Sequence, residues 1–353
     1  MANGLPFRPG HSRGVRVSFL YVPAKYTGDV PSPIWRTIDL DRGDHGVRVD
    51  RVLLRHLRDE RAISRNRIQK WIDAGDVLVN GTPPSRAAWR VQAGDDVRVK
   101  IEHLQPRTRP AAQAMDLDVL YEDGDLLALN KPAGLVVHPS YKNTGGTLMN
   151  GVLERARAWP EGSRPGLLGR LDKDTSGVVV VAKRPAVHAA LQRAMDARGI
   201  EKDYAAIVWG RPSPQRGTID LALDRDPWDR RRITVTDRGG QPSVTKYERL
   251  ATTPAFSLVK CRLITGRTHQ IRVHLSARGW PIVGDAVYGR KRKGAELTPL
   301  DEIAHAVPRQ ALHAWRLSLR HPTTGAAMEI VAPLPDDMCK LAHDLCLPTV
   351  ALA

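Results

Sequence analysis

The run Gly-Val-Val-Val-Val-Ala-Lys, residues 177–183, constrains the fold more than any other stretch of this chain. Four consecutive β-branched residues favour a strand, and the lack of polar alternation indicates that both faces of that strand are buried. A polar turn containing Arg170, Asp172, Lys173 and Asp174 leads directly into the strand. A loop held by a rigid strand is a common place for a catalytic group, although a surface turn is the plainer alternative. We therefore treat Asp172 as a candidate catalytic carboxylate.

Helical and strand patterns lie on both sides of this segment. Residues 148–156 and 187–195 repeat apolar side chains at helical spacing, and Pro185 suits the first turn of the second helix. Residues 259–263 alternate between apolar and basic side chains, which predicts a half-buried strand. The larger part of the chain therefore mixes strands with helices.

A second candidate for the chemistry follows that half-buried strand. Residues from Thr268 to about Arg278 fit a helix that Thr268 caps and Gly279 ends. This interpretation places Arg267 at a helix N-terminus, where free backbone N–H groups favour an anion. An arginine there can pair with a buried carboxylate, keep it ionised and let it act as a nucleophile. A surface salt bridge is the alternative.

The charge balance favours a polyanionic partner. The formal net charge is +16 over 353 residues, which suits nucleic acid first and a membrane surface or acidic proteins second. The three cysteines form no C-x-x-C pair, so we expect a cytoplasmic location without a disulfide framework or a zinc site. No apolar run approaches the about 20 residues of a membrane span, and residues 1–14 lack the apolar segment of a signal peptide.

The length allows two or three domains. Residues 104–114 are rich in Pro, Arg and Ala, which predicts a linker. Residues 1–46 are dominated by Pro, Gly and Arg and are expected to form a loosely held N-terminal extension. The linker then separates a small module, residues 47–103, from a larger one, residues 115–353.

The small module contains a short amphipathic helix. Ser64 is a good N-cap, and Ile68, Trp71 and Ile72 share one buried face. Asn80-Gly81 fits a tight turn of a small hairpin sheet. The helix leaves three basic side chains largely to solvent: Arg65, Arg67 and Lys70. They suit contacts to an RNA backbone, or they merely keep the helix soluble.

Two family resemblances cover most of the chain. The combination SRxxIQKWIxxGxVxVNG, within residues 47–99, resembles the S4 RNA-binding domain. In the larger module, GRLDKDTSG, EKDYAAIVWG and TGRTHQIRVHL resemble the three catalytic motifs of RluA-type RNA pseudouridine synthases. NKPAGLVVHPS, PIVGDAVYG and QALHAWRLSLRHPTTG match as well, so that this similarity spans about residues 117–336. It implies an α+β catalytic fold, with a mixed, largely antiparallel sheet and flanking helices, beside a small S4-like α/β module.

The resemblance also implies roles for single residues. Asp172 matches the catalytic aspartate, and Arg170 matches the arginine that enters the RNA helix when the target uridine is flipped out. Tyr204 matches the tyrosine that lies against the base, and Arg267 matches the arginine paired with the aspartate. One departure is Gly169, which stands where members of this family commonly have His.

Further basic residues are candidate RNA contacts. The stretch with Arg230, Arg231 and Arg232 resembles the family's mobile loop that clasps RNA, and these side chains would neutralise phosphates. A solvated charge run is the alternative. Lys131 is either a phosphate contact or a turn residue.

The reaction implied is the isomerisation of uridine to pseudouridine, in which uracil leaves ribose C1′, turns and rejoins through C5. Base flipping exposes the target, and Asp172 either attacks C1′ or removes the C2′ proton. Tyr204 would stack on the uracil and assist the loss of the C5 proton, although its ordinary pKa of about 10 makes it a weak candidate base. We expect no cofactor or metal, and a monomer.

The expected substrate is RNA, with large-subunit (23S) ribosomal RNA favoured by analogy and transfer RNA as the alternative. Two other functions compete with this interpretation. A non-catalytic RNA-binding protein would use Asp172 only as a turn residue, and an N-glycosidase would release free uracil.

Overall fold

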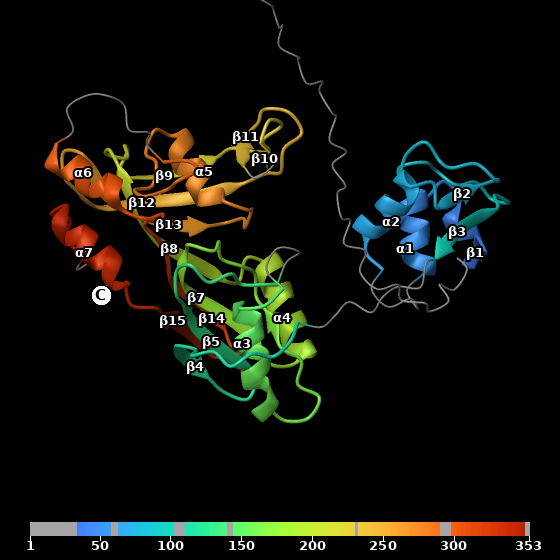
Figure 1. Cartoon of the computed structure of the whole chain (residues 1–353), viewed down its shortest axis with the longest axis horizontal. Helices are drawn as coiled ribbons and strands as arrows, with labels where there is room; N and C mark the ends of the chain where they lie inside the picture. The colour runs from blue at the N-terminus through green and yellow to red at the C-terminus, as the bar shows by residue number, and fades with distance from the viewer. Residues whose placement is uncertain are drawn as a thin grey trace, which may run out of the picture. The chain divides into compact units, whose positions relative to one another are not determined.

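The computed structural model describes residues 34–57, 63–101, 110–139, 144–229, 232–289 and 298–349 (Figure 1). The chain divides into two compact units, Met1–Thr108 and Arg109–Ala353. Each unit has its own hydrophobic core.

The first unit packs helices against a three-stranded antiparallel sheet in the order β1-β3-β2. Its strands are β1 (Ile34–Ile38), β2 (Val77–Val79) and β3 (Val97–Ile101). Its helices are α1 (Val49–His56), α2 (Arg65–Asp73) and the 3-10 helix η1 (Arg42–Asp44). The predicted helix is confirmed as α2, because the Ser64 hydroxyl accepts a hydrogen bond from the backbone N–H of Arg67 and three apolar side chains are buried beneath it: Ile68, Trp71 and Ile72.

Two of the expected module boundaries are corrected by packing. β1 pairs with β3 over its whole length, so residues 34–38 belong to the sheet of the first unit. Residues 39–46 follow within the same unit and not in an N-terminal extension; residues 1–33 lie outside the described part. Residues 110–114 are not a free linker either. Asn150 donates a hydrogen bond to the carbonyl of Ala111 (2.6 Å), and the backbone N–H of Gly146 donates to Gln113 (2.6 Å).

The second unit is built on a ten-stranded sheet in the order β4-β5-β7-β14-β8-β13-β12-β9, with β6 beside β7 and β15 beside β14. Among the described strand pairs, β7 with β14 is the parallel one. The expected mixed, largely antiparallel sheet is therefore confirmed. The strands are β4 (Val119–Glu122), β5 (Leu126–Lys131), β6 (Gly166–Leu167), β7 (Ser176–Ala182), β8 (Glu201–Trp209), β9 (Arg216–Asp220), β12 (Val244–Thr252), β13 (Phe256–Leu263), β14 (Leu312–Arg320) and β15 (Ala327–Val331).

Helices cover the sheet, and a small hairpin stands apart from it. The helices are α3 (Leu148–Arg155), α4 (Pro185–Asp196), α5 (Gln270–Ala277), α6 (Pro299–Ala306), α7 (Asp336–Asp344) and the 3-10 helix η2 (Ala156–Ala158). The hairpin strands are β10 (Leu223–Arg225) and β11 (Ile233–Val235). They pair with each other, and β11 lies against α5 (Figure 1).

The valine run forms β7, and all seven residues of this strand are buried. Alternate valines face opposite sides of the sheet: Val179 joins the core cluster that contains Val152 of α3, and Val180 joins the cluster that contains Leu191 of α4. Each buried valine side chain contributes about 1.5–3 kcal/mol of hydrophobic stabilisation. The strand that follows the Asp172 loop is therefore anchored from both faces.

Candidate active site

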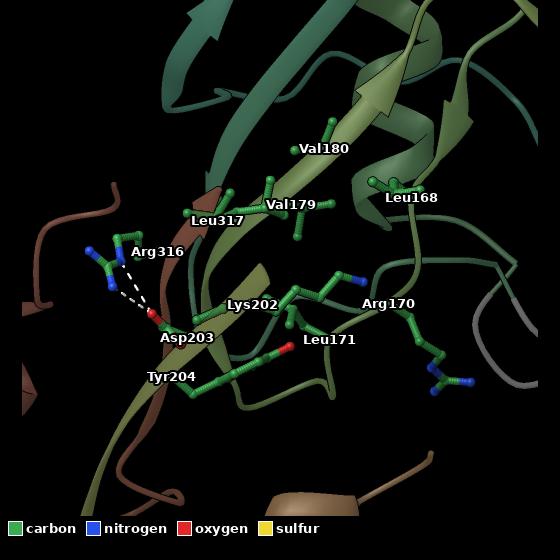
Figure 2. Close-up of a pocket in the computed structure, with 12 residues that line it drawn as sticks. Leu168, Arg170, Leu171, Val179, Val180, Lys202, Asp203, Tyr204, Arg316 and Leu317 are labelled. Atoms are coloured by element: carbon green, nitrogen blue, oxygen red, sulfur yellow. Dashed lines mark hydrogen bonds and ion pairs between the residues drawn. The ribbon is translucent and has the colours of Figure 1, made fainter. Parts of the chain in front are cut away.

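A cavity of about 160 Å³ lies where the loop before β7 meets β8 and the start of α5. Four of the residues predicted to carry the chemistry line it: Arg170, Asp172, Tyr204 and Arg267. A smaller pocket of about 30 Å³ adjoins it and shares the side chains of Arg170, Tyr204 and Lys202. Figure 2 shows Arg170 extending away from the side chains of Tyr204 and Lys202, and Arg170 is exposed.

The Asp172 carboxylate is held from one side and open on the other. Its Oδ2 lies 3.0 Å from Nη1 of Arg272 and 3.8 Å from Nε2 of His269, and the side chain is 19% exposed. Its backbone carbonyl accepts a hydrogen bond from the N–H of Thr175 (3.1 Å), which closes the turn into β7. The carboxylate is thus charge-paired but still accessible from the cavity.

Arg272 is shared between two carboxylates. Its Nε and Nη2 bind both oxygens of Asp285 at 2.7 and 2.9 Å, while Nη1 reaches Asp172. The guanidinium is 7% exposed and the Asp285 side chain is fully buried. Burial alone lowers the pKa of Arg272, but the bonds and charges of Asp285 and Asp172 outweigh it and raise that pKa. The same pairing lowers the pKa of Asp285 against the effect of its burial.

The expected pairing of Arg267 with Asp172 is wrong, because Arg272 makes that ion pair. Arg267 lies exposed at the rim of the cavity. The helix also starts later than expected: α5 begins at Gln270, and His269 precedes it in the left-handed conformation (φ 56°) instead of a Thr268 side-chain cap. His269 and Arg272 are therefore site residues that the sequence analysis missed, although both lie in the motif TGRTHQIRVHL that it singled out.

Tyr204 sits in β8 with 7% of its surface exposed. Burial, and to a smaller extent the charge of Asp172, raise its pKa above the ordinary value. The phenol is therefore protonated at neutral pH, and its predicted help as a base in the loss of the C5 proton is disfavoured. Asp203 points to the opposite face of β8 and binds Arg262 of β13 (2.7 and 2.8 Å) and Arg316 of β14 (2.7 Å). This clamp fixes the strand that carries Tyr204.

Lys131 is a structural residue, and its predicted contact with phosphate is wrong. The side chain is fully buried, and Nζ donates hydrogen bonds to the carbonyls of Pro132 (2.8 Å), Leu135 (2.8 Å) and Lys173 (2.9 Å). An ammonium has three donors, so all three are satisfied internally. The lysine ties the turn after β5 to the Asp172 loop.

The other predicted RNA contacts have varied surroundings. In the first unit Lys70 is exposed, Arg65 is 3.3 Å from Asp50, and the guanidinium of Arg67 lies 5.8 Å from the centre of the Trp71 ring. In the second unit Arg232 lies 5.6 Å from the ring centre of Tyr288. Arg230 and Arg231 are outside the described residues.

Within the described ranges, one group of side chains has metal-ligand spacing: Asp41, Asp44 and His56. Arg55 forms ion pairs with both of these carboxylates, so one of their two negative charges is balanced within the protein. No described helix is both long and apolar enough to cross a membrane.

Comparison with known proteins agrees with this architecture. A family model for RNA pseudouridylate synthases matches residues 125–277, and one for the S4 domain matches residues 47–97. The chain is 41% identical over 286 residues to an uncharacterized RNA pseudouridine synthase, YlyB, of Bacillus subtilis, with 80% of this chain and 89% of the relative covered.

Two further proteins that are similar to most of this chain belong to the same family. A ribosomal large subunit pseudouridine synthase D of Xanthomonas campestris is 41% identical, covering 80% of this chain and 85% of the relative. The structure of human RNA pseudouridylate synthase domain containing 4 superposes with a TM-score of 0.54 at 28% identity, over 66% of this chain and 94% of that one. The chain therefore belongs to the RNA pseudouridine synthases of the RluA type, an enzyme family, and carries an S4 domain before its catalytic unit.

Proposed function

We propose that this enzyme converts specific uridines of large-subunit ribosomal RNA into pseudouridine, with Asp172 as the catalytic carboxylate. The observation that carries the proposal is the accessible Asp172 carboxylate, bound by the buried Arg272 guanidinium in a cavity beside Tyr204. The named function of the Xanthomonas relative supports the choice of ribosomal RNA. The cavity is smaller than the about 300–1,000 Å³ typical of small-molecule sites, which favours a single flipped nucleobase.

In this proposal the residues divide the work. Asp172 either forms a bond to ribose C1′ as the C1′–N1 bond breaks, or takes the C2′ proton to give a glycal. Arg272 keeps the carboxylate ionised and oriented. The uracil turns and C5 bonds to C1′, as the bond between Asp172 and C1′ breaks in the first route or as Asp172 returns the proton to C2′ in the second. The C5 proton is then lost while N1 gains one. Tyr204 supplies a buried ring against the base, and the exposed Arg170 occupies the space the base leaves in the RNA helix.

RNA contacts away from the cavity are proposed for further basic side chains. Arg65, Arg67 and Lys70 would bind phosphates through the S4 domain, and Arg230, Arg231 and Arg232 would bind phosphates from the catalytic unit. Each such contact contributes about one unit to the salt dependence of binding. A cytoplasmic, monomeric enzyme remains our expectation.

The decisive experiment is pseudouridine mapping of total RNA from a deletion strain, complemented with the wild type or with Asp172→Asn. Sites in large-subunit ribosomal RNA should disappear on deletion and return with the wild type alone. Loss of sites from transfer RNA instead would show that transfer RNA, and not ribosomal RNA, is the substrate. Rescue by Asp172→Asn would favour a non-catalytic binding protein, and release of free uracil by the purified enzyme would favour an N-glycosidase.

A further inference from the structure

The buried Tyr288 hydroxyl lies between the β10–β11 hairpin and the active site. It accepts a hydrogen bond from the backbone N–H of Ile233 in β11 (2.8 Å) and shares a second one with Nδ1 of His269 (2.9 Å). The two rings meet edge to face at 5.6 Å. One hydroxyl therefore connects the hairpin backbone to the residue whose other ring nitrogen faces Asp172.

The ring of Tyr288 lies near two guanidinium groups, one beside the hairpin and one in the active site. Arg272 lies 5.1 Å from the ring centre and Arg232, beside β11, lies 5.6 Å from it, both within the range of cation–π attraction. The backbone N–H of Tyr288 donates to Oδ1 of Asp285 (3.0 Å), the oxygen that also accepts from Arg272 (2.9 Å). Tyr288 therefore contacts both residues that face Asp172: it hydrogen-bonds His269 and packs its ring beside Arg272.

The hairpin packs on α5 through this contact region, and backbone hydrogen bonds between Leu223 and Gln241 (3.0 and 2.8 Å) also hold β10. β10 and β11 pair with each other and not with a strand of the central sheet, and an isolated two-stranded hairpin is marginally stable. Its apolar side chains pack in a separate cluster with Tyr288 and with Val273 of α5. The apolar contact of the hairpin with the rest of the unit therefore includes Tyr288 and Val273.

His269 is held in an unfavourable backbone conformation at the same place. A left-handed conformation costs a residue with a side chain about 1–2 kcal/mol and persists where surrounding contacts fix it. The bond to Tyr288 is one such contact. Burial lowers the pKa of His269, although the charge of Asp172 opposes this, so the ring faces the carboxylate uncharged at neutral pH.

We propose that Tyr288 is a positioning residue that couples the seating of the hairpin on RNA to the placement of His269 and Arg272 at Asp172. This inference rests on the proposed function, because it requires the hairpin to contact the RNA that is modified. RNA bound to the hairpin stabilises the arrangement in which the Ile233 N–H reaches Tyr288. The hydroxyl then holds His269, and the ring holds the guanidinium of Arg272.

The test is Tyr288→Phe, which removes the hydroxyl and keeps the ring in its cluster. The substrate is an unmodified transcript of large-subunit ribosomal RNA. Loss of the two hydrogen bonds should lower the single-turnover rate about tenfold, while the dissociation constant for RNA changes less than about twofold. Tyr247→Phe is the matched control, because this buried tyrosine packs on Trp280 (ring centres 5.2 Å apart) and should leave both quantities unchanged.

A double-variant cycle with His269→Asn distinguishes coupling from simple support of the fold. Asn tolerates the left-handed conformation, so the backbone at residue 269 is retained. If Tyr288 acts through His269, Tyr288→Phe should cause little further loss in the His269→Asn background. An unchanged single-turnover rate in Tyr288→Phe, or fully additive losses, would overturn the inference. A wild-type enzyme that forms no pseudouridine in this transcript would instead overturn the proposed substrate.

Discussion

Replacement of Arg272 by methionine removes the charge that two carboxylates share. Methionine keeps an unbranched side chain of good helix propensity in α5, so the main loss is electrostatic. Asp285 would remain fully buried without its bidentate partner, and Asp172 would lose the 3.0 Å contact to Nη1. The same substitution at Arg267 is the control, because that guanidinium is exposed at the rim of the same cavity.

The size of the effect follows from the burial of Asp285. Removing one partner of a buried ion pair costs about 3–5 kcal/mol of unfolding free energy. We expect the lower end of this range, because the backbone N–H groups of Val287 and Tyr288 still donate to Asp285 at 2.9 and 3.0 Å. The exposed Arg267→Met should change the unfolding free energy by less than about 0.5 kcal/mol.

Urea unfolding followed by circular dichroism measures this difference, and pseudouridine formation measures the loss at the site. The pKa of Asp285 is lowered in the native state. The stability due to the pair is therefore fully present above the unfolded-state pKa of about 3.9 and is lost as the pH falls through the lower native value. Equal stability of the two variants at pH 7, or loss of activity in Arg267→Met alone, would refute the assignment.

Three further substitutions test other parts of the structure. Lys131→Met should lower the unfolding free energy by about 3 kcal/mol, since it removes the three hydrogen bonds that the buried ammonium donates, yet leave the salt dependence of RNA binding unchanged; a weaker salt dependence in the variant would support the phosphate contact. Burial lowers the pKa of His313 to about 4, so the unfolding free energy should fall by up to about 3 kcal/mol as the pH drops from about 6.5 to 4. The His313→Gln variant, titrated over the same range, should not show this loss. Gly177→Ala should prevent folding of the second unit, because its β-carbon would overlap the carbonyl of Ala314 where β7 pairs with β14. Gly134 has open space around it, so Gly134→Ala should cost only about 1 kcal/mol of unfolding free energy, measured in a thermal melt.

The elements with the strongest local patterns were predictable. The valine run gave β7 because a strand buried on both faces leaves no polar position to alternate. Ser64 and Pro185 marked the starts of α2 and α4 because a cap and a first-turn proline act within one helical turn. The family followed from motifs that match in order along most of the chain.

The errors arose where distant segments decide the environment of a side chain. Lys131 lies in a turn-like sequence, but one of the three carbonyls that bind its buried ammonium belongs to Lys173, 42 residues later in the chain. Arg267 and Arg272 carry the same charge in the same motif. Which of them faces Asp172 depends on the left-handed His269, because that conformation delays the helix and sets its rotation. Histidine is among the residues enriched in this conformation, but only a small fraction of residues other than glycine adopt it, so the sequence alone did not predict it at this position.

The corrected assignment also explains why one motif contains two arginines. Arg272 binds Asp285 with two of its nitrogens, so Asp172 shares a guanidinium that already pairs with another carboxylate. Because His269 is uncharged, the cluster of Asp172, Arg272 and Asp285 keeps a net charge of −1. A carboxylate site with that charge repels the phosphates of an approaching RNA. The exposed guanidinium groups of Arg170 and Arg267 at the cavity offset the repulsion without neutralising the carboxylate itself. Buried and exposed arginines thus serve opposite needs: one preserves the reactive anion, and the others allow a polyanion to reach it.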